Sequence, residues 1–386
     1  MSDLNTLAPD NRDLSMFPGE YGLPFLGKTV EFVKDTLAMC NKHYEKYGPV
    51  SRLDMVKNQR VLMCLGPEFN EATLFDPKGN FSVAGGYASS LGGLYPDGML
   101  TRDDAKHKRT RRASQPAFKN DALKTYVDML IPIQERRIQD LPINEEFIFY
   151  DNIQKTLMDV AARVFIGLDE LSPEAKKLGH LFSEINEGLI TPLPYDLPFL
   201  QFRKSLKARE ELRQFFIENI PKRRGSNGLD MFTRYCNAKD EDGEYLDDID
   251  IDGHIAFLLF AAFDTTTSAL TNILYYLGKN PEWQDKVRNE IFSVTNEMPT
   301  FEDLAEMNLT EYVFQETLRF YPSVMVLNRR TTRDVNVAGY DIPANTVVMI
   351  SPPFTHRMEQ WWDCLLYTSD AADDSLRVDL GGRRII

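Results

Sequence analysis

Cysteine and histidine are scarce in this chain of 386 residues, with four and five copies. The cysteines show neither paired nor metal-ligand spacing and are expected to be reduced thiols of a cytoplasmic protein: Cys40, Cys64, Cys236 and Cys364. Long apolar runs are also missing, because the longest, Ile255 to Phe263, is far shorter than the roughly 20 residues that span a bilayer. The first 20 residues lack the pattern of a targeting signal. We therefore expect a soluble chain without a stable membrane anchor.

Positive charge is in deficit. Lys and Arg number 44 against 58 Asp and Glu, which gives a net charge of −14 and argues against general nucleic-acid binding. Hydrophobic residues make up 43% and aromatic residues 11%, enough for a large packed core. No repeat, low-complexity tract or long linker is visible, so one large α-rich domain is the simplest expectation.

Hydrophobic periodicity predicts mostly helices with small β-sheets. Hairpins are expected over 49–66, turning at Lys57–Gln59, and over 334–351. Helices are expected over 68–75, 121–141, 151–168, 174–190, 205–220, 254–283 and 301–322. Residues 191–202 are rich in proline and aromatics and should form a loop or broken helix with exposed apolar side chains. Residues 223–230 and the acidic stretch 240–252 are expected to be surface connections.

The stretch "AAFDTTTSAL", Ala261 to Leu270, places an acid and four hydroxyls in the middle of an otherwise apolar helix. A mid-helix Thr can donate to the carbonyl one turn back and bend the helix. Asp264 and Thr265 could then relay protons into a closed cavity. A polar stripe that faces solvent or a neighbouring helix explains the same residues, because unpartnered buried acids are costly.

Two further patterns carry charge. In "ETLR", Glu316 and Arg319 share one helix face at i and i+3, which suits either a surface ion pair or, given the apolar neighbours, a buried network. The segment "DDAKHKRTRRASQPAF" is strongly basic, and its His107 and Arg111 lie one helical turn apart. It could be a solvated face, an anion site or a dock for an acidic partner. Its basic residues are Arg102, Lys106, Lys108, Arg109, Arg111 and Arg112.

Taken in order, these motifs resemble the cytochrome P450 family of haem-thiolate monooxygenases. "AAFDTT" is similar to the family's oxygen-activating helix, with Ala262 in place of the usual Gly, and "ETLR" is similar to its Glu-any-any-Arg helix. "HKRTRRASQPAF" resembles a propionate-binding segment, and "NRRTTRDVNVAGYDIPANTVVMISPPFTHRMEQWWD" the hairpin region after that helix. The resemblance runs from about Phe17 to Asp363.

This resemblance implies roles for individual residues. Asp264 and Thr265 would be catalytic, with Thr265 in the oxygen site and Asp264 feeding protons toward it. The cofactor is expected to be haem b, with propionates neutralised by His107, Arg111 and Arg329. Glu316 and Arg319 would be structural. Ala261 and Thr266 are also expected to line the cofactor site.

The family's axial cysteine loop is the part that this sequence lacks. Its thiolate favours O–O cleavage, but only Cys364 follows the second hairpin, too early and without the Phe and Gly residues of that loop. The segment 364–386 resembles translated adaptor sequence and is expected to be non-native and disordered. The expected organisation is therefore a flexible stretch 1–16, an incomplete P450 domain over 17–363 without the thiolate loop and last helix, and this tail.

The resemblance implies oxidation of a small apolar substrate (a sterol, terpenoid, retinoid or fatty acid) with O2. Electrons would come from NAD(P)H through a ferredoxin- or flavodoxin-like redox partner and its reductase, and the remaining basic residues of the propionate-binding segment would dock that partner. The chain as written is expected to be inactive, because the cysteine ligand is absent. Two alternatives stay open: a P450-type isomerase or dehydratase, against which Asp264 and Thr265 count, and a non-catalytic helical fragment that binds hydrophobic ligands.

Overall fold

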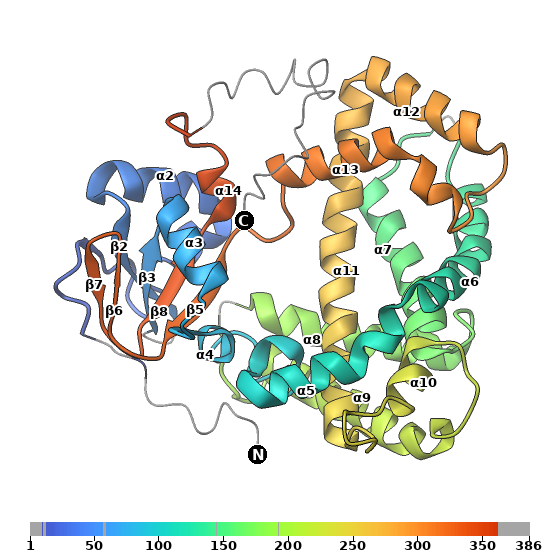
Figure 1. The fold of residues 1–386 in the computed structure, drawn as a ribbon, viewed down its shortest axis with the longest axis horizontal. Coiled ribbons are helices and arrows are strands. Elements are labelled where there is room, and N and C mark those ends of the chain that lie inside the picture. The colour runs from blue at the N-terminus through green and yellow to red at the C-terminus, as the bar shows by residue number, and fades with distance from the viewer. Residues whose placement is uncertain (1–9, 11–12, 57–58, 144, 192, 362–386) are drawn as a thin grey trace. The chain divides into compact units, whose positions relative to one another are not determined.

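The computed structural model describes residues 10, 13–56, 59–143, 145–191 and 193–361 (Figure 1). They divide into two units, one made of the residues up to Ser89 and from Leu318 onward, the other of Ser90–Thr317. The first unit carries the sheets, and the second is almost entirely helical. The expected mainly helical fold with small sheets is confirmed. The domain limits 1–16, 17–363 and 364–386 stay a prediction, and the tail lies outside the described residues.

The first unit is organised around a six-stranded sheet with strand order β1-β2-β3-β8-β5-β4, next to a two-stranded sheet of β6 and β7. The strands are β1 (Gly19–Glu20), β2 (Val50–Met55), β3 (Gln59–Cys64), β4 (Phe81–Ser82), β5 (Leu327–Thr331), β6 (Val335–Val337), β7 (Tyr340–Ile342) and β8 (Val347–Ile350). The helices of this unit are α1 (Thr29–Lys34), α2 (Thr36–Tyr47), α3 (Pro67–Phe75), α4 (Val83–Tyr87) and α14 (Pro352–Thr355).

The first predicted hairpin is confirmed as the antiparallel pair β2–β3. The second was only partly right, because β6 and β7 form a hairpin while β8 leaves it to pair with β3 in parallel and β5 antiparallel. Alternation along β3 explains why the large sheet is buried on both faces. Leu62 and Cys64 join one apolar cluster, whereas Val61 and Met63 join the other.

The second unit holds the long helices. They are α5 (Asp104–Ser114), α6 (Asn120–Gln139), α7 (Phe149–Val160), α8 (Pro173–Ile190), α9 (Gln201–Arg223), α10 (Met231–Cys236), α11 (Asp248–Lys279), α12 (Pro281–Val294) and most of α13 (Asn308–Phe320). A π-helical turn, Ala161–Ile166, extends α7. Between α8 and α9 the expected apolar loop is confirmed, with Phe199 98% exposed. The expected helix over 301–322 begins only at Asn308, after a 3-10 turn.

Helix α11 runs the length of the second unit (Figure 1). Asp247 caps it, accepting a hydrogen bond from the Asp250 backbone N–H at 2.6 Å, which satisfies one of the unpaired donors of the first turn. Among the described residues α11 alone has the length and hydropathy of a membrane-spanning helix, but the core helix of a soluble protein meets the same criteria.

The expectation that 240–252 is a surface connection was wrong at its C-terminal end. Asp250 and Asp252 belong to the first turns of α11 and are 2% and 3% exposed. They are tolerated there because each carboxylate faces a buried arginine, which offsets the cost of removing the charge from water. Acidic composition alone could not distinguish these residues from the exposed ones before them.

Candidate functional site

The middle of α11 is partly exposed, whereas the beginning of the helix is buried. From Asp250 to Leu259 all residues but one are buried, whereas from Phe260 to Thr266 every residue is partly or fully exposed. The Thr265 hydroxyl donates to the Ala261 carbonyl at 2.6 Å, as predicted. The helix nevertheless stays α-helical throughout. The polar centre is thus a partly exposed stretch of a continuous helix, Phe260 to Thr266, which we call the notch.

Asp264 is the acidic residue of this notch, and the pKa of its carboxyl is unusual. Its side chain is exposed, yet the apolar groups around it remove enough water to raise the pKa of its carboxyl. The pKa of Tyr95 is raised by burial and further by the charge of Asp264, which places this phenol near the acid. A carboxyl with a raised pKa holds a proton closer to neutral pH and can pass it on.

Aromatic rings flank the notch. The Tyr95 ring stacks on Phe260, one turn before Asp264, with centroids 4.8 Å apart. The Phe182 ring of α8 meets Phe263 edge-on at 5.5 Å. The Tyr95 hydroxyl donates to Asn186 Oδ1 on α8 at 3.0 Å. The sequence does not predict these contacts of Tyr95, Phe182 and Asn186, because isolated aromatic and amide residues give no local signal.

On α5, the structure places His107 and Arg111 together. His107 is half-buried and Arg111 is exposed. Burial lowers the pKa of His107, and the charge of Arg111 lowers it further, so His107 is neutral near pH 7. A neutral imidazole beside a guanidinium still offers several hydrogen-bond donors to an anion.

The expected basic patch on α5 is smaller than the sequence suggested. Arg102 is 1% exposed and does not belong to it. Arg109 pairs with Asp240 at 2.7 Å, and Arg112 pairs with Glu241 at 2.5 Å. An acidic loop of the same unit therefore neutralises two of the patch's guanidinium groups.

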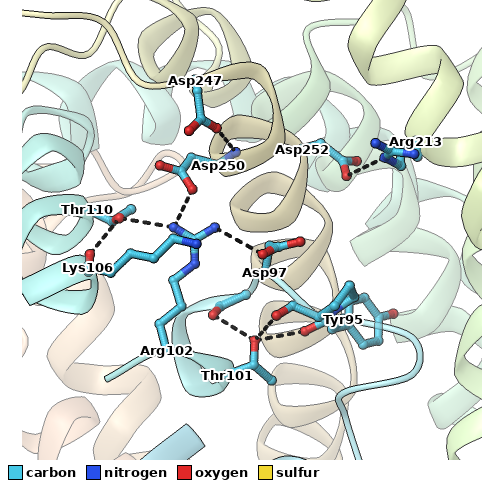
Figure 2. Close-up of polar contacts among 12 residues, drawn as sticks. Tyr95, Asp97, Thr101, Arg102, Lys106, Thr110, Arg213, Asp247, Asp250 and Asp252 are labelled. Carbon is cyan, nitrogen blue, oxygen red and sulfur yellow. Dashed lines mark hydrogen bonds and ion pairs between the residues drawn. The ribbon is translucent and has the colours of Figure 1, made fainter. Parts of the chain in front are cut away.

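Arg102 belongs to a buried charge system that the sequence did not reveal (Figure 2). Its Nη1 lies 2.5 Å from Asp250 Oδ1. Arg209 of α9 binds Asp252 through both terminal nitrogens, at 3.0 and 2.7 Å, and its Nε donates to the Leu94 carbonyl at 3.1 Å. Two arginines thus clamp the first turns of α11 from different segments.

The other predicted residues lie elsewhere. Ala261 and Thr266 are half-buried on α11. Arg329 lies on β5 of the first unit, where its Nη1 donates to the Asn328 carbonyl at 2.9 Å, and its convergence with His107 and Arg111 stays a prediction. Glu316 and Arg319 are half-buried near the end of α13, and their pairing also stays a prediction.

A missed residue holds the start of α13. The Glu290 carboxylate on α12 accepts hydrogen bonds from the backbone N–H groups of Leu309 and Thr310, at 2.6 and 2.8 Å. These are unpaired donors of the first helical turn, so Glu290 caps α13 from outside. A mid-helix glutamate gives no sequence signal for such a role.

Comparison with known proteins identifies the family. The family model described as Cytochrome P450 matches residues 17–364. This chain belongs to the cytochrome P450 family. Its members are haem monooxygenases that use O2 and electrons from a redox partner.

Several P450 relatives cover most of the chain. The chain is 29% identical to a "Putative cytochrome P450 136" of Mycobacterium tuberculosis, over 92% of the chain and 72% of that protein. It is 26% identical to "Taxoid 14-beta-hydroxylase" of Taxus cuspidata, over 89% and 70%. A solved structure of retinoic acid-bound cyanobacterial CYP120A1 superposes with a TM-score of 0.81 at 27% identity, covering 89% of this chain and 79% of that chain.

The described residues fit only part of a P450 haem site. The notch of α11, with small Ala261 beside Thr265, suits the oxygen-binding side. The axial thiolate is not supplied by the three described cysteines, which are buried. Burial raises the pKa of Cys40 to about 11 and of Cys236 to about 12, and that of Cys64 well above its usual range. Cys364 lies outside the described residues.

Proposed function

We propose that the site on α11 serves hydroxylation of a small apolar molecule with O2, using two electrons from a separate redox protein. The observation that carries this proposal is a carboxyl of raised pKa, Asp264, next to the Thr265 hydroxyl on a helix flanked by aromatic rings. When bound, haem supplies the oxygen chemistry in this family.

Within this proposal, Asp264 and Thr265 are the catalytic residues. Asp264 can bind and release a proton in a weakly hydrated setting, because burial raises the pKa of its carboxyl above the ordinary aspartate value. The Thr265 hydrogen is directed to the Ala261 carbonyl, so the hydroxyl oxygen can accept a hydrogen bond from a water or an O–H group. The pair can therefore order a proton donor at the notch. This favours a monooxygenase over a P450-type isomerase or dehydratase, which needs no external proton supply.

The cofactor and partner surfaces follow from α5 and β5. His107 and Arg111 of α5 and Arg329 of β5 offer donors of the kind that bind haem propionates. Ala261 and Thr266 are the residues of α11 proposed to contact the cofactor. Lys108 is exposed and keeps positive charge on this helix for an acidic redox partner. Relatives named for taxane and β-amyrin oxidation support a terpenoid within the sterol, terpenoid, retinoid and fatty-acid range.

A second candidate applies to the 386-residue polypeptide itself. Because the three described cysteines are buried, with Cys64 and Cys40 packed into the two apolar clusters of the large sheet, we propose that this polypeptide forms no thiolate-ligated haem. It would then bind apolar ligands without oxidising them. This polypeptide and the monooxygenase should differ in the absorption band of the ferrous–carbon monoxide complex, which can be measured directly.

The test is haem titration of the purified polypeptide, followed by reduction and addition of carbon monoxide. We expect haem uptake without the ferrous–carbon monoxide band of thiolate-ligated P450 proteins, and that band would overturn the inactivity proposal. Ala261→Phe, which fills the notch, should abolish uptake. The exposed Ala305→Phe is the matched control and should leave it unchanged, and equal uptake by both variants would contradict the proposed site.

A further inference from the structure

We infer that Asn186 recognises an uncharged oxygen atom on the substrate, its Nδ2 donating a hydrogen bond to a carbonyl or hydroxyl oxygen while Tyr95 fixes the orientation of the amide. The preferred substrate is then a neutral, oxygen-bearing apolar molecule rather than a hydrocarbon or a carboxylic acid. This inference rests on the proposed function, because it concerns the same site on α11.

Tyr95 is rigid. It is 0% exposed, and its ring stacks on Phe260 and meets Phe257 edge-on. Within the described residues, its hydroxyl makes one hydrogen bond, to Asn186 Oδ1 at 3.0 Å. A buried hydroxyl hydrogen needs an acceptor, so the amide oxygen is the atom that turns toward Tyr95.

The opposite end of the Asn186 amide is therefore presented outward. Asn186 is half-buried, and its Nδ2 donates to no group within the described part of the chain. It lies one turn after Phe182 on α8, on the same helix face, and Phe182 contacts Phe263 of the notch. An amide donor thus stands beside the open, aromatic stretch of α11.

The surrounding charges disfavour an anionic ligand. Arg209 is the positive charge that acts on the pKa of Tyr95. All three of its guanidinium nitrogens already donate hydrogen bonds, to Asp252 and to the Leu94 carbonyl. Asp264, the other charge that reaches Tyr95, is acidic. Among the described charges that act on Tyr95, a ligand carboxylate would meet the like charge of Asp264 and an arginine that is already paired. A neutral oxygen needs only the amide donor.

The experiment uses one carbon skeleton in four forms: farnesene, farnesol, farnesal and farnesoic acid. Binding to the 386-residue polypeptide is measured by isothermal titration calorimetry at pH 8. We expect farnesol and farnesal to bind about three- to tenfold more tightly than farnesene, the ratio for one hydrogen bond, and farnesoic acid to bind more weakly than farnesol.

Three variants separate the roles. Asn186→Leu should remove the advantage of farnesol while farnesene binding persists. Tyr95→Phe keeps the stacked ring and should reduce the advantage about twofold, since it only orients the amide. Asn219→Leu, at a half-buried amide on α9, is the control and should keep the full advantage.

The outcomes distinguish this inference from the proposed function. If farnesene binds but farnesol has no advantage, or the advantage survives in Asn186→Leu, the inference is wrong and the apolar site stands. Tightest binding of farnesoic acid would also overturn it. If none of the four ligands binds, both the inference and the proposed apolar site fail.

Discussion

Arg102 and Asp250 form an ion pair whose side chains are only 1% and 3% exposed, with Nη1 and Oδ1 2.5 Å apart. The pair joins the segment before α5 to the first turn of α11. Asp250→Ala leaves the buried guanidinium with only the more distant Asp97 carboxylate, 3.7 Å away, and the Thr110 hydroxyl. We therefore expect the free energy of unfolding to fall by about 3 kcal/mol. Urea denaturation measures this loss.

The double variant Arg102→Met/Asp250→Leu tests the cause, because it removes both charges and should recover much of the lost stability. The exposed pair Arg112 and Glu241 is the control, and Arg112→Ala should cost at most about 1 kcal/mol. Equal losses in Asp250→Ala and Arg112→Ala would show that burial of the first pair is not what matters.

His254 predicts an acid-sensitive fold. It is 1% exposed, and burial, followed by the charge of Arg102, lowers its pKa from 6.5 to about 3. Below pH 6.5 this histidine binds a proton in the unfolded chain but stays neutral in the folded chain. The free energy of unfolding therefore falls as the pH falls from 6.5 toward 3, by up to about 1.4 kcal/mol per pH unit. In urea denaturation at pH 7 and 5, His254→Gln should lose less stability than the parent protein. Parallel losses would exclude this role.

Asp264 predicts the opposite dependence on pH. Its raised pKa means that the folded chain keeps a proton at pH values where the unfolded chain has released it. Stability is therefore lost as pH rises from the ordinary aspartate value of 3.8 through the raised pKa, and the difference stays constant above it. Asp264→Asn removes this titration and should become more stable relative to the parent between pH 4 and 7. An unchanged difference over that range would show an ordinary carboxyl.

Two glycines should respond to alanine in opposite directions. At Gly86 an added Cβ would lie 2.6 Å from the Arg329 Cα, so Gly86→Ala must displace β5 and should cost about 1–3 kcal/mol. At Gly278, in the last turn of α11, no described atom apart from the helix's own nearby backbone and the two neighbouring residues lies within 4 Å of the added Cβ. Gly278→Ala should stabilise by about 0.5–1 kcal/mol. Thermal denaturation compares them, and a stabilising Gly86→Ala would refute the close approach.

Sequence patterns predicted the features that depend on residues close together in the chain. The apolar α11 with its polar centre, the Thr265 hydrogen bond to the carbonyl one turn back and the β2–β3 hairpin all follow from short-range periodicity and donor–acceptor geometry. The family resemblance is confirmed by the match over residues 17–364.

Long-range pairing could not be predicted in the same way. Arg102 stands in a basic run and Asp250 in an acidic run, so each resembles a surface residue until the fold brings them together. Tyr95 and Asn186 likewise depend on a contact between a loop and a distant helix. The departure of β8 from its expected hairpin depends on pairing with β3, for which the strand's own residues carry no signal.

The two ion pairs Arg102–Asp250 and Arg209–Asp252 fix the rotation of α11 about its axis, and with it the direction of the helix's side chains. Asp250 and Asp252 are about 200° apart around the helix axis, so Arg102 and Arg209 hold it from nearly opposite sides and prevent it from turning. Asp264 lies about 18 Å further along the same rigid rod. The direction around the helix axis in which the Asp264 carboxyl points is therefore set by two guanidinium groups that do not contact it.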